Sequence, residues 1–234
     1  MKRKSKQNQK EVFCLIPARS KSKRIKDKNI QIIKGLELFV HAIRFAKTFK
    51  NLEICFSTDS KKYLNIAKKY IKVGSLRPKK LALDHVKTYD VFKYELEKTE
   101  KQQNMKFKYF LLLQPTVPFR KKIDLKKALK YIKQKNVDSV VSLNSVEGNH
   151  PYRMKKINNK NFVLNFINKK KENMEPIQKL PNLYIRSGAI YLIKRKAFYK
   201  YKNLLGTKVR PIIVKDKYAI NIDNYKDLII ARNF

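Results

Sequence analysis

The sequence predicts an α/β fold in which a mostly parallel sheet is covered by helices on both faces. Short apolar runs alternate along the chain with longer segments whose apolar residues recur at helical spacing, as they do in successive βαβ units. The 234 residues suffice for one large α/β domain, and 43% of them are apolar, which argues against a disordered basic chain.

The expected elements follow one another in a regular order. Strands are expected at 12–17, 52–57, 71–75, 109–114 and 139–143, with helices at 38–48, 61–70, 88–101 and 123–134. Strand-like runs return at 189–193 and 210–214, and a helix over 225–231 follows them. This order predicts a single sheet rather than separate α and β layers.

Two segments lie outside the alternation. Residues 1–10 are strongly basic and are expected to form a disordered tail, whereas residues 11–234 are expected to form one domain. Within that domain, 148–187 contains Gly148, Pro151 and Pro176 and the alternating run NFVLNFI. Such punctuation indicates an inserted antiparallel arm.

The formal net charge of +39 has two interpretations. Clustered cations bind nucleic acid by releasing counterions from its phosphates. Alternatively, the lysines form a solvated surface that attracts small anionic substrates. We favour the second interpretation because the basic residues are scattered and the basic loop 18–29 has no aromatic residue on which a base could stack.

The sequence favours a cytoplasmic protein without a membrane segment. No apolar run approaches the roughly 18 to 20 residues that span a bilayer. The apolar run 12–17, after the basic N-terminus, is too short for a signal peptide. Cys14 and Cys55 lie in predicted strands and are expected to be buried thiols rather than a disulfide or a metal site.

Polar residues gather directly after the predicted strands. In doubly wound sheets, ligands bind outside the carboxyl ends of the strands, so we expect these residues to meet in one cleft. The basic loop after the first strand can cradle a triphosphate, although it lacks the spacing of a P-loop or a dinucleotide fingerprint. The candidates after the first, third and fourth strands are Arg19, Ser22, Lys23, Lys28, Asn29, Arg77, Asp84 and Gln114.

Asn221 and Asp223 form a candidate metal site near the end of the chain. Two oxygen ligands at positions i and i+2 of an extended segment point to the same side, as a hard cation such as Mg²⁺ requires. The alternative interpretation is that this segment caps the helix that follows.

Taken together, these segments resemble the CMP-N-acylneuraminate (sialic acid) synthetase family, also called the acylneuraminate cytidylyltransferases. The resemblance runs in order from about residue 12 to residue 231. Its blocks are IPARSKSKRIKDKNI (16–30), STDS (57–60), RPKKLALD (77–84), LLLQPTVPFR (111–120), HPYR (150–153), QKLPNLYIRSGAIY (178–191) and NIDNYKDLIIA (221–231).

The resemblance implies a Rossmann-like nucleotidyltransferase fold that forms homodimers through the arm. It also implies an enzyme that transfers CMP from CTP to an acidic nonulosonate sugar (N-acylneuraminate, legionaminate or pseudaminate) and releases pyrophosphate. In this family Arg19, Ser22, Lys23, Lys28 and Asn29 would hold the phosphates and ribose of CTP, with Arg19, Lys28 and Asp223 catalytic. The segment from Arg77 to Asp84 would read cytosine, Gln114 would contact the sugar, Arg153 would reach the sugar carboxylate of the neighbouring subunit, and Asp223 with Asn221 would bind Mg²⁺ or Mn²⁺.

The sequence departs from the family pattern at several positions. Ser20 and Lys21 stand where the family has glycines, and Asn221 replaces a metal-binding aspartate. These changes leave a low-activity paralogue as an alternative. A 3-deoxy-manno-octulosonate cytidylyltransferase is another, although those enzymes typically have Lys-Pro where this chain has Lys28 and Asn29. A basic nucleic-acid-binding protein is the alternative outside the enzyme class.

Overall fold

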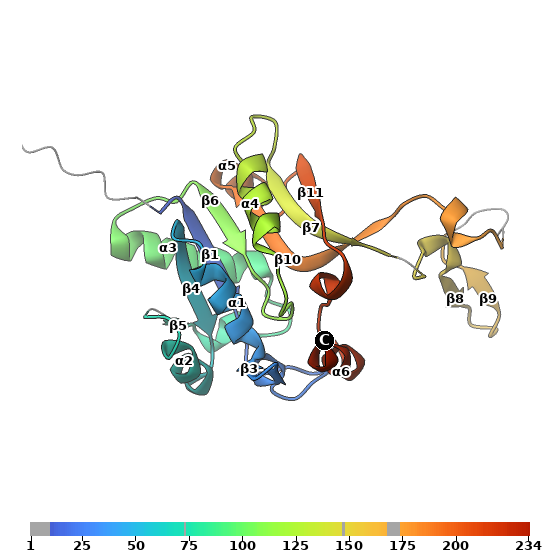
Figure 1. Ribbon diagram of the computed structural model, residues 1–234, viewed down its shortest axis with the longest axis horizontal. Helices are drawn as coiled ribbons and strands as arrows, with labels where there is room; N and C mark the ends of the chain where they lie inside the picture. The colour runs from blue at the N-terminus through green and yellow to red at the C-terminus, as the bar shows by residue number, and fades with distance from the viewer. Residues whose placement is uncertain (1–9, 73, 147, 168–173) are drawn as a thin grey trace, which may run out of the picture.

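The computed structural model describes residues 10–72, 74–146, 148–167 and 174–234. All but the last residue of the expected tail 1–10 therefore lies outside the described residues. The centre of the fold is a seven-stranded sheet of order β11-β7-β10-β6-β1-β4-β5 (Figure 1). Its strands are β1 Val12–Pro17, β4 Leu52–Thr58, β5 Gly74–Leu76, β6 Tyr109–Leu112, β7 Ser139–Ser145, β10 Tyr184–Lys194 and β11 Val209–Ile213.

The sheet is mostly parallel, as the sequence predicts. The pairs of β1 with β4, β1 with β6, β4 with β5 and β7 with β11 are all parallel. Strand β10 alone runs antiparallel to both of its neighbours, β6 and β7. The chain proceeds from β1 through β4 to β5 on one side and then places β6 on the other side of β1. The strand order therefore reverses between β1 and β6, which is where ligands bind in this class of sheet.

The side chains of β1 point alternately to the two faces of the sheet, which explains why helices cover both faces. Cys14 and Ile16 pack with α1 Leu38–Lys47, α2 Lys61–Lys68 and α4 Lys122–Tyr131. Phe13 and Leu15 point to the opposite face and pack with α3 Thr88–Gln103 and α5 Arg195–Tyr201. Successive side chains of a strand point to opposite faces, so a continuous apolar run such as VFCLI has to be buried on both.

The inserted segment is a small arm that projects from the sheet (Figure 1). Its strands β8 Lys155–Ile157 and β9 Val163–Asn165 form an antiparallel pair. The arm exposes apolar side chains: Ile157 is 69%, Phe162 64%, Val163 66% and Phe166 60% exposed. Strand β10 begins at Tyr184. The last residues of the range 148–187 therefore belong to the strand that leads back from the arm into the central sheet.

The structure corrects several element predictions. The third strand is expected at 71–75, but β5 is Gly74–Leu76. Helix α5 is not predicted, because RKAFYKY follows β10 without a turn residue between them. The hairpin of β2 Ile32–Ile33 and β3 Leu36–Glu37 is also missed. Its two-residue turn takes positive φ at Lys34 (47°) and Gly35 (76°), as a tight hairpin requires.

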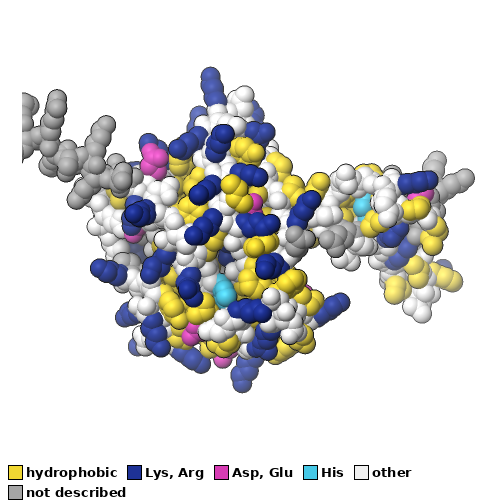
Figure 2. All heavy atoms as spheres, viewed as in Figure 1, with side chains coloured by type: hydrophobic (Ala, Val, Ile, Leu, Met, Phe, Trp, Pro, Cys, Tyr) yellow, Lys and Arg dark blue, Asp and Glu magenta, His cyan; other side chains and the backbone are white. Residues whose placement is uncertain are grey.

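Cations are dispersed over the face of the molecule seen in Figure 2. Figure 2 shows Lys and Arg side chains spread over the visible face rather than gathered into one stripe. Helix α6 Tyr225–Asn233 comes last in the element order. Within the described ranges, no helix is both long and apolar enough to cross a bilayer.

Candidate functional site

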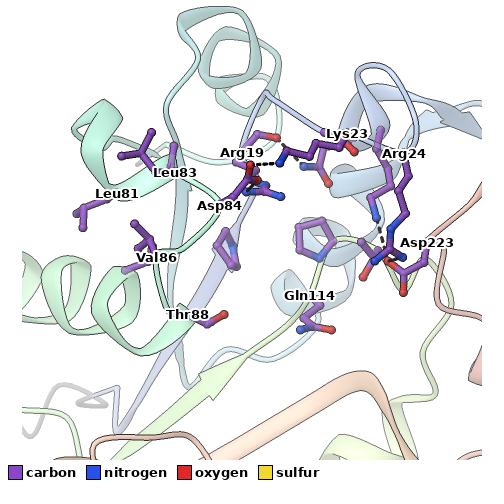
Figure 3. A pocket seen from close by; sticks show the side chains of 18 of the residues that line it. Arg19, Lys23, Arg24, Leu81, Leu83, Asp84, Val86, Thr88, Gln114 and Asp223 are labelled. Atoms are coloured by element: carbon purple, nitrogen blue, oxygen red, sulfur yellow. Dashed lines mark hydrogen bonds and ion pairs between the residues drawn. The ribbon is translucent and has the colours of Figure 1, made fainter. Parts of the chain in front are cut away.

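A cleft of about 550 Å³ opens where the strand order reverses (Figure 3). Its walls come from the basic loop after β1, the segment after β5, the loop after β6 and the extended segment before α6. The predicted site residues that line it are Arg19, Ser22, Lys23, Lys28, Asn29, Arg77, Asp84, Gln114, Asn221 and Asp223. Arg153 is absent from this cleft: it lies in the arm, and its Nη2 donates to the carbonyl of Glu175 at 2.9 Å.

Asp84 pairs with two cations of the basic loop. Arg19 Nη1 lies 2.7 Å from Asp84 Oδ1, and Lys23 Nζ lies 2.6 Å from Oδ2. The hydrogen bond from Lys23, helped by the one from Arg19, holds the pKa of the Asp84 carboxyl below its usual range. Asp84 therefore joins the segment after β5 to the loop after β1. Its negative charge lies beside Arg19 and Lys23, the cations to which a phosphate would bind.

Lys28 joins the basic loop to the segment before α6. Its Nζ donates to the carbonyl of Ile222 at 2.8 Å and lies 3.2 Å from Asp223 Oδ1. Arg24 approaches the same carboxylate oxygen at 3.9 Å. Only 14% of the Lys28 side chain is exposed. The ammonium is thus fixed at the cleft wall, where little further ordering is needed for it to meet an anionic ligand.

Asn221 and Asp223 do not cap the final helix. Asn224 and Asp227 form its capping box, which excludes the capping interpretation of the earlier pair. Asn221 Nδ2 donates to Asp223 Oδ2 at 2.9 Å, while its Oδ1 is buried without a partner. A buried acceptor beside a carboxylate is a donor set that suits Mg²⁺, which commonly takes one or two carboxylates and completes its shell with water and phosphate. No group of three or more His, Cys, Asp or Glu residues suited to a metal occurs among the described residues.

Asn29 braces the basic loop from within. Its Nδ2 donates to the carbonyl of Arg19 at 2.9 Å, which leaves Oδ1 buried and unpartnered. That remaining atom only accepts hydrogen bonds, so it suits a hydroxyl or amine rather than a phosphate oxygen. Asn29 thus presents an unpartnered acceptor at the cleft.

Arg77 forms a buried part of the cleft wall, with 5% of its surface exposed. Its Nη1 donates to the carbonyl of Ser57 at 2.8 Å and to the Ser57 hydroxyl at 3.1 Å. Burial lowers the pKa of the guanidinium, and the nearby carboxylates of Asp59 and Glu95 oppose that effect. Arg77 Nε has no partner. In the described part of the chain, the only buried side-chain nitrogen and oxygen atoms without partners are Arg77 Nε, Asn29 Oδ1 and Asn221 Oδ1, all on residues that line the cleft.

The basic loop holds its shape without the family's glycines. Ser20 N and Oγ both donate to the carboxylate of Asp59, at 2.9 Å and 2.7 Å. Tyr63 donates to Asp27 Oδ1 at 3.0 Å. Asp27 alone among the described residues of 18–29 takes a positive φ, 51°. The serine at position 20 therefore supplies a side-chain anchor instead of conformational freedom.

Gln114 is held just beyond the end of β6 by the half-buried Arg120. Arg120 donates to the carbonyls of Gln114 and Val117, each at 2.6 Å, and to that of Ala189 at 2.8 Å. These bonds tie the loop after β6 to the irregular part of β10, where the register shifts between Arg186 and Tyr191. Bulges of this kind often re-aim side chains next to binding sites.

Asp59 was expected near the cleft, after the second strand, but without a role, and Glu95 was not predicted. Asp59 lies in the STDS block, but its link to Ser20 joins positions far apart in the chain. Glu95 lies inside a helix, where a carboxylate usually faces solvent, and yet it is 1% exposed. Its only local signal is its place on the same helical face as Val91, Phe92 and Leu96, which are buried.

A doubly wound sheet with a basic, partly apolar cleft at its switch point defines a nucleotide-binding α/β protein. Comparison with protein families identifies which nucleotide-binding family the chain matches. The cytidylyltransferase family model matches residues 13–228. The chain therefore belongs to the cytidylyltransferase family, which confirms the resemblance and the enzyme class inferred from the sequence.

Individual relatives agree with that assignment. The N-acylneuraminate cytidylyltransferase of Streptococcus agalactiae serotype III is 30% identical over 93% of this chain, which covers 51% of that protein. The CMP-N,N'-diacetyllegionaminic acid synthase of Legionella pneumophila is 31% identical over 91% of this chain and 90% of its own length. The chain thus spans about half the length of the Streptococcus relative and nearly all of the Legionella one.

A solved structure confirms the fold. The CMP:2-keto-3-deoxy-manno-octonic acid synthetase complexed with CTP superposes with a TM-score of 0.66 over 95% of this chain and 97% of its own. The sequences are 16% identical, so this likeness concerns the fold alone.

Proposed function

We propose that this protein transfers CMP from CTP to the anomeric hydroxyl of an acidic nonulosonate sugar and releases pyrophosphate. The observation that carries the proposal is the division of one cleft into a cationic half and an apolar half at the switch point of the sheet. The names of the relatives support the same chemistry, because they describe N-acylneuraminate and legionaminic acid enzymes.

The two halves of the cleft suit the two ends of a nucleotide. Leu81, Leu83 and Val86 lie on one side, and Arg19, Lys23 and Arg24 lie on the other (Figure 3). A pyrimidine ring is flat and largely apolar on its faces, so it suits the first side, next to the buried Arg77. The triphosphate suits the second side, where the cations of the loop and Lys28 offset its charge.

The reaction then needs alignment more than covalent chemistry. The anomeric oxygen attacks the α-phosphorus, the bond to the bridging β-phosphate oxygen breaks, and pyrophosphate leaves with that electron pair. Such transfers are accelerated by positioning the nucleophile in line and by stabilising charge on the leaving group. Arg19 and Lys28, both held in place before the ligand arrives, are the residues proposed for that stabilisation.

Mg²⁺, or Mn²⁺ in its place, belongs to the proposal as the metal of the reaction. Asp223 and the free Oδ1 of Asn221 would hold it, and it would supply neutralisation of charge on the diphosphate when bound.

The sugar is proposed to bind beside Gln114, and a homodimer to complete its site. The exposed apolar side chains of the arm, among them Phe162 and Val163, would pack on a second copy. Arg153 would then face the sugar carboxylate in the partner's cleft, which agrees with its absence from its own. Because the substrate is a nucleoside triphosphate, we propose that the enzyme works in the cytoplasm.

The other candidate functions are not favoured. Relatives at about 30% identity are named for N-acylneuraminate, legionaminic acid and pseudaminic acid, whereas the octulosonate enzyme is similar in fold alone. The cations that Figure 2 shows on the visible face are dispersed, and the basic loop 18–29 has no aromatic residue on which a base could stack.

The decisive experiment is a pyrophosphate-release assay of the purified protein with CTP, Mg²⁺ and a panel of acidic sugars. The panel contains N-acetylneuraminate, a legionaminate, a pseudaminate and 3-deoxy-manno-octulosonate. We expect release with at least one nonulosonate and much less with the octulosonate. Release with none of the nonulosonates would contradict the proposed activity or show that the chain is inactive.

A further inference from the structure

A buried carboxylate next to Arg77 has no part in the mechanism above. Glu95, on α3, is 1% exposed, and its Oε1 accepts a hydrogen bond of 2.6 Å from the hydroxyl of Ser57. Ser57 itself is fully buried. Removing a carboxylate from water costs far more than one hydroxyl returns, so a buried carboxylate needs a cation nearby.

Ser57 connects this carboxylate to the cleft wall. A hydroxyl has one hydrogen, and here it is given to Glu95, so Ser57 Oγ is an acceptor towards its other neighbour. That neighbour is Arg77, whose Nη1 donates to the same Oγ at 3.1 Å and to the Ser57 carbonyl at 2.8 Å. The order Arg77 to Ser57 to Glu95 is therefore fixed in direction, from the cleft wall to the helix.

The positive charge of Arg77 is offset within the protein by two carboxylates. Glu95 and Asp59 both attract the Arg77 guanidinium. Arg24, in contrast, is 71% exposed in its side chain and lies 3.9 Å from the nearest carboxylate oxygen. Because nearby carboxylates already offset the charge of Arg77, a phosphate would add little electrostatic stabilisation. The N–H groups of Arg77 can still donate hydrogen bonds, so the side chain suits a neutral acceptor. The apolar side chains of Leu81, Val86 and Val91 line the same cleft.

This inference rests on the proposed function. We propose that Glu95 is a positioning residue which acts through Ser57 to fix Arg77 as a hydrogen-bond donor to the neutral pyrimidine ring of the nucleotide. The phosphates are left to the cations of the basic loop. Glu95 and Ser57 therefore contribute to affinity for the base and not to affinity for the triphosphate.

Calorimetric titration with two probes separates these contributions. CTP carries base and phosphates, whereas inorganic tripolyphosphate carries the charge alone. In Glu95→Gln and Ser57→Ala we expect the Kd for CTP to rise about tenfold, and the Kd for tripolyphosphate to stay within about twofold of wild type. The matched control is Glu97→Gln, on the same helix with a side chain that is 52% exposed, which should leave both constants unchanged.

A double-mutant cycle tests the path through Arg77. Once Arg77→Gln has removed the donor, Glu95→Gln should weaken CTP binding no further, because the two residues act as one unit. Equal losses for CTP and tripolyphosphate, an unchanged Kd for CTP, or full additivity with Arg77→Gln would each overturn the inference. If Glu95→Gln does not fold, Ser57→Ala decides by the same criterion. A wild type that binds tripolyphosphate but gains nothing from the base would instead contradict the proposed function.

Discussion

Gly188 and Gln114 lie so close that a side chain at position 188 would have to displace the Gln114 amide. A β-carbon at position 188 would stand 2.4 Å from Gln114 Oε1, far inside van der Waals contact. Gly188 also has φ +81°, in the left-handed region that side chains disfavour. It lies where β10 changes register, so the irregular strand gives the Gln114 amide the space it occupies at the cleft.

Gly188→Ala should therefore impair the sugar side of the site. The new methyl group would displace the Gln114 amide, and we expect KM for the sugar to rise about tenfold while KM for CTP changes little. The matched control is Gly35→Ala, which has φ +76° and no atom within 4 Å of the added carbon. Both variants should lose about 1–2 kcal/mol of folding free energy through strain at positive φ. A sugar KM that rises equally in both would contradict the role of Gln114.

Lys28→Ala should lower kcat/KM about a hundredfold or more, because it removes a preorganised cation from the phosphate side. A basic loop residue would be expected to be exposed and unimportant for stability. The structure shows otherwise, since Lys28 bonds the carbonyl of Ile222 and Asp223. We therefore also expect a loss of about 1 kcal/mol in the free energy of unfolding. Lys26→Ala, an exposed lysine of the same loop, is the control and should behave as wild type.

CTP with Mg²⁺ should raise the melting temperature more than other nucleotides do. A ligand at about 100 times its Kd stabilises the folded state by about 2.7 kcal/mol, which for a chain of this size is a shift of about 5–10 °C. ATP and GTP should give smaller shifts, because a purine is larger than the ring for which the Arg77 side of the cleft is proposed. Equal shifts with all nucleotides, together with tight salt-sensitive binding to RNA, would support the nucleic-acid alternative.

Local pattern predicted most of the fold because the apolar runs that form β1, β4, β6 and β7 are buried on both faces. It did not predict that β10 runs antiparallel. The run AIYLI is equally apolar in either direction, and its direction depends on the arm that precedes it, from which β10 leads back between β6 and β7. Helix α5 was missed because its seven residues are too few for a helical period to stand out.

The site was predictable where its residues stand at the ends of strands, as Arg19 and Gln114 do. The residues with which they pair could not be predicted from the sequence. Asp84 pairs with Arg19 across 65 positions, and Glu95 accepts a bond from Ser57 across 38. Such pairs depend on how helices and loops pack over the sheet, which no local spacing encodes. The assignment of Asn221 and Asp223 to a helix cap was an open alternative until Asn224 proved to be the cap.

Asp84→Asn should strengthen binding of the triphosphate group. The carboxylate holds Arg19 and Lys23 and repels phosphate, so its removal frees both cations. We expect tripolyphosphate to bind about two- to tenfold more tightly at low ionic strength, with the difference fading as salt screens these exposed charges. Because the pKa of Asp84 lies below its usual range, the carboxylate stays ionised at neutral pH. The two ion pairs are lost only as the pH falls through that lowered pKa, and wild type should then bind as the variant does. Weaker binding of tripolyphosphate by Asp84→Asn at neutral pH would contradict this prediction and show that Asp84 holds Arg19 and Lys23 where they bind the phosphates.

Metal binding is expected to depend on the charge at position 221. Asn221 Nδ2 donates to Asp223 Oδ2 at 2.9 Å, so Asn221→Asp places two carboxylates in contact without a proton between them. In the absence of metal this variant should be less stable than wild type by about 1–2 kcal/mol. Metal affinity at oxygen sites rises with ligand charge, so Mg²⁺ should raise its melting temperature more than it raises that of wild type.

A Mg²⁺ titration of the initial rate should rank the variants in the same order as their metal affinities. Asn221→Asp should reach half-maximal rate at lower Mg²⁺ than wild type, and Asp223→Asn should have almost no activity because its only carboxylate is gone. Mn²⁺, which oxygen and nitrogen sites generally bind more tightly, should activate wild type at lower concentration than Mg²⁺ does. Binding of Mn²⁺ measured by electron paramagnetic resonance checks the order without relying on turnover. Neither exchange replaces a side chain of the capping box of Asn224 and Asp227, and the bond from the Asp223 backbone N–H to Asp227 does not depend on the Asp223 side chain. Three superimposable rate curves, with equal Mn²⁺ affinities, would show that these two residues do not bind the metal.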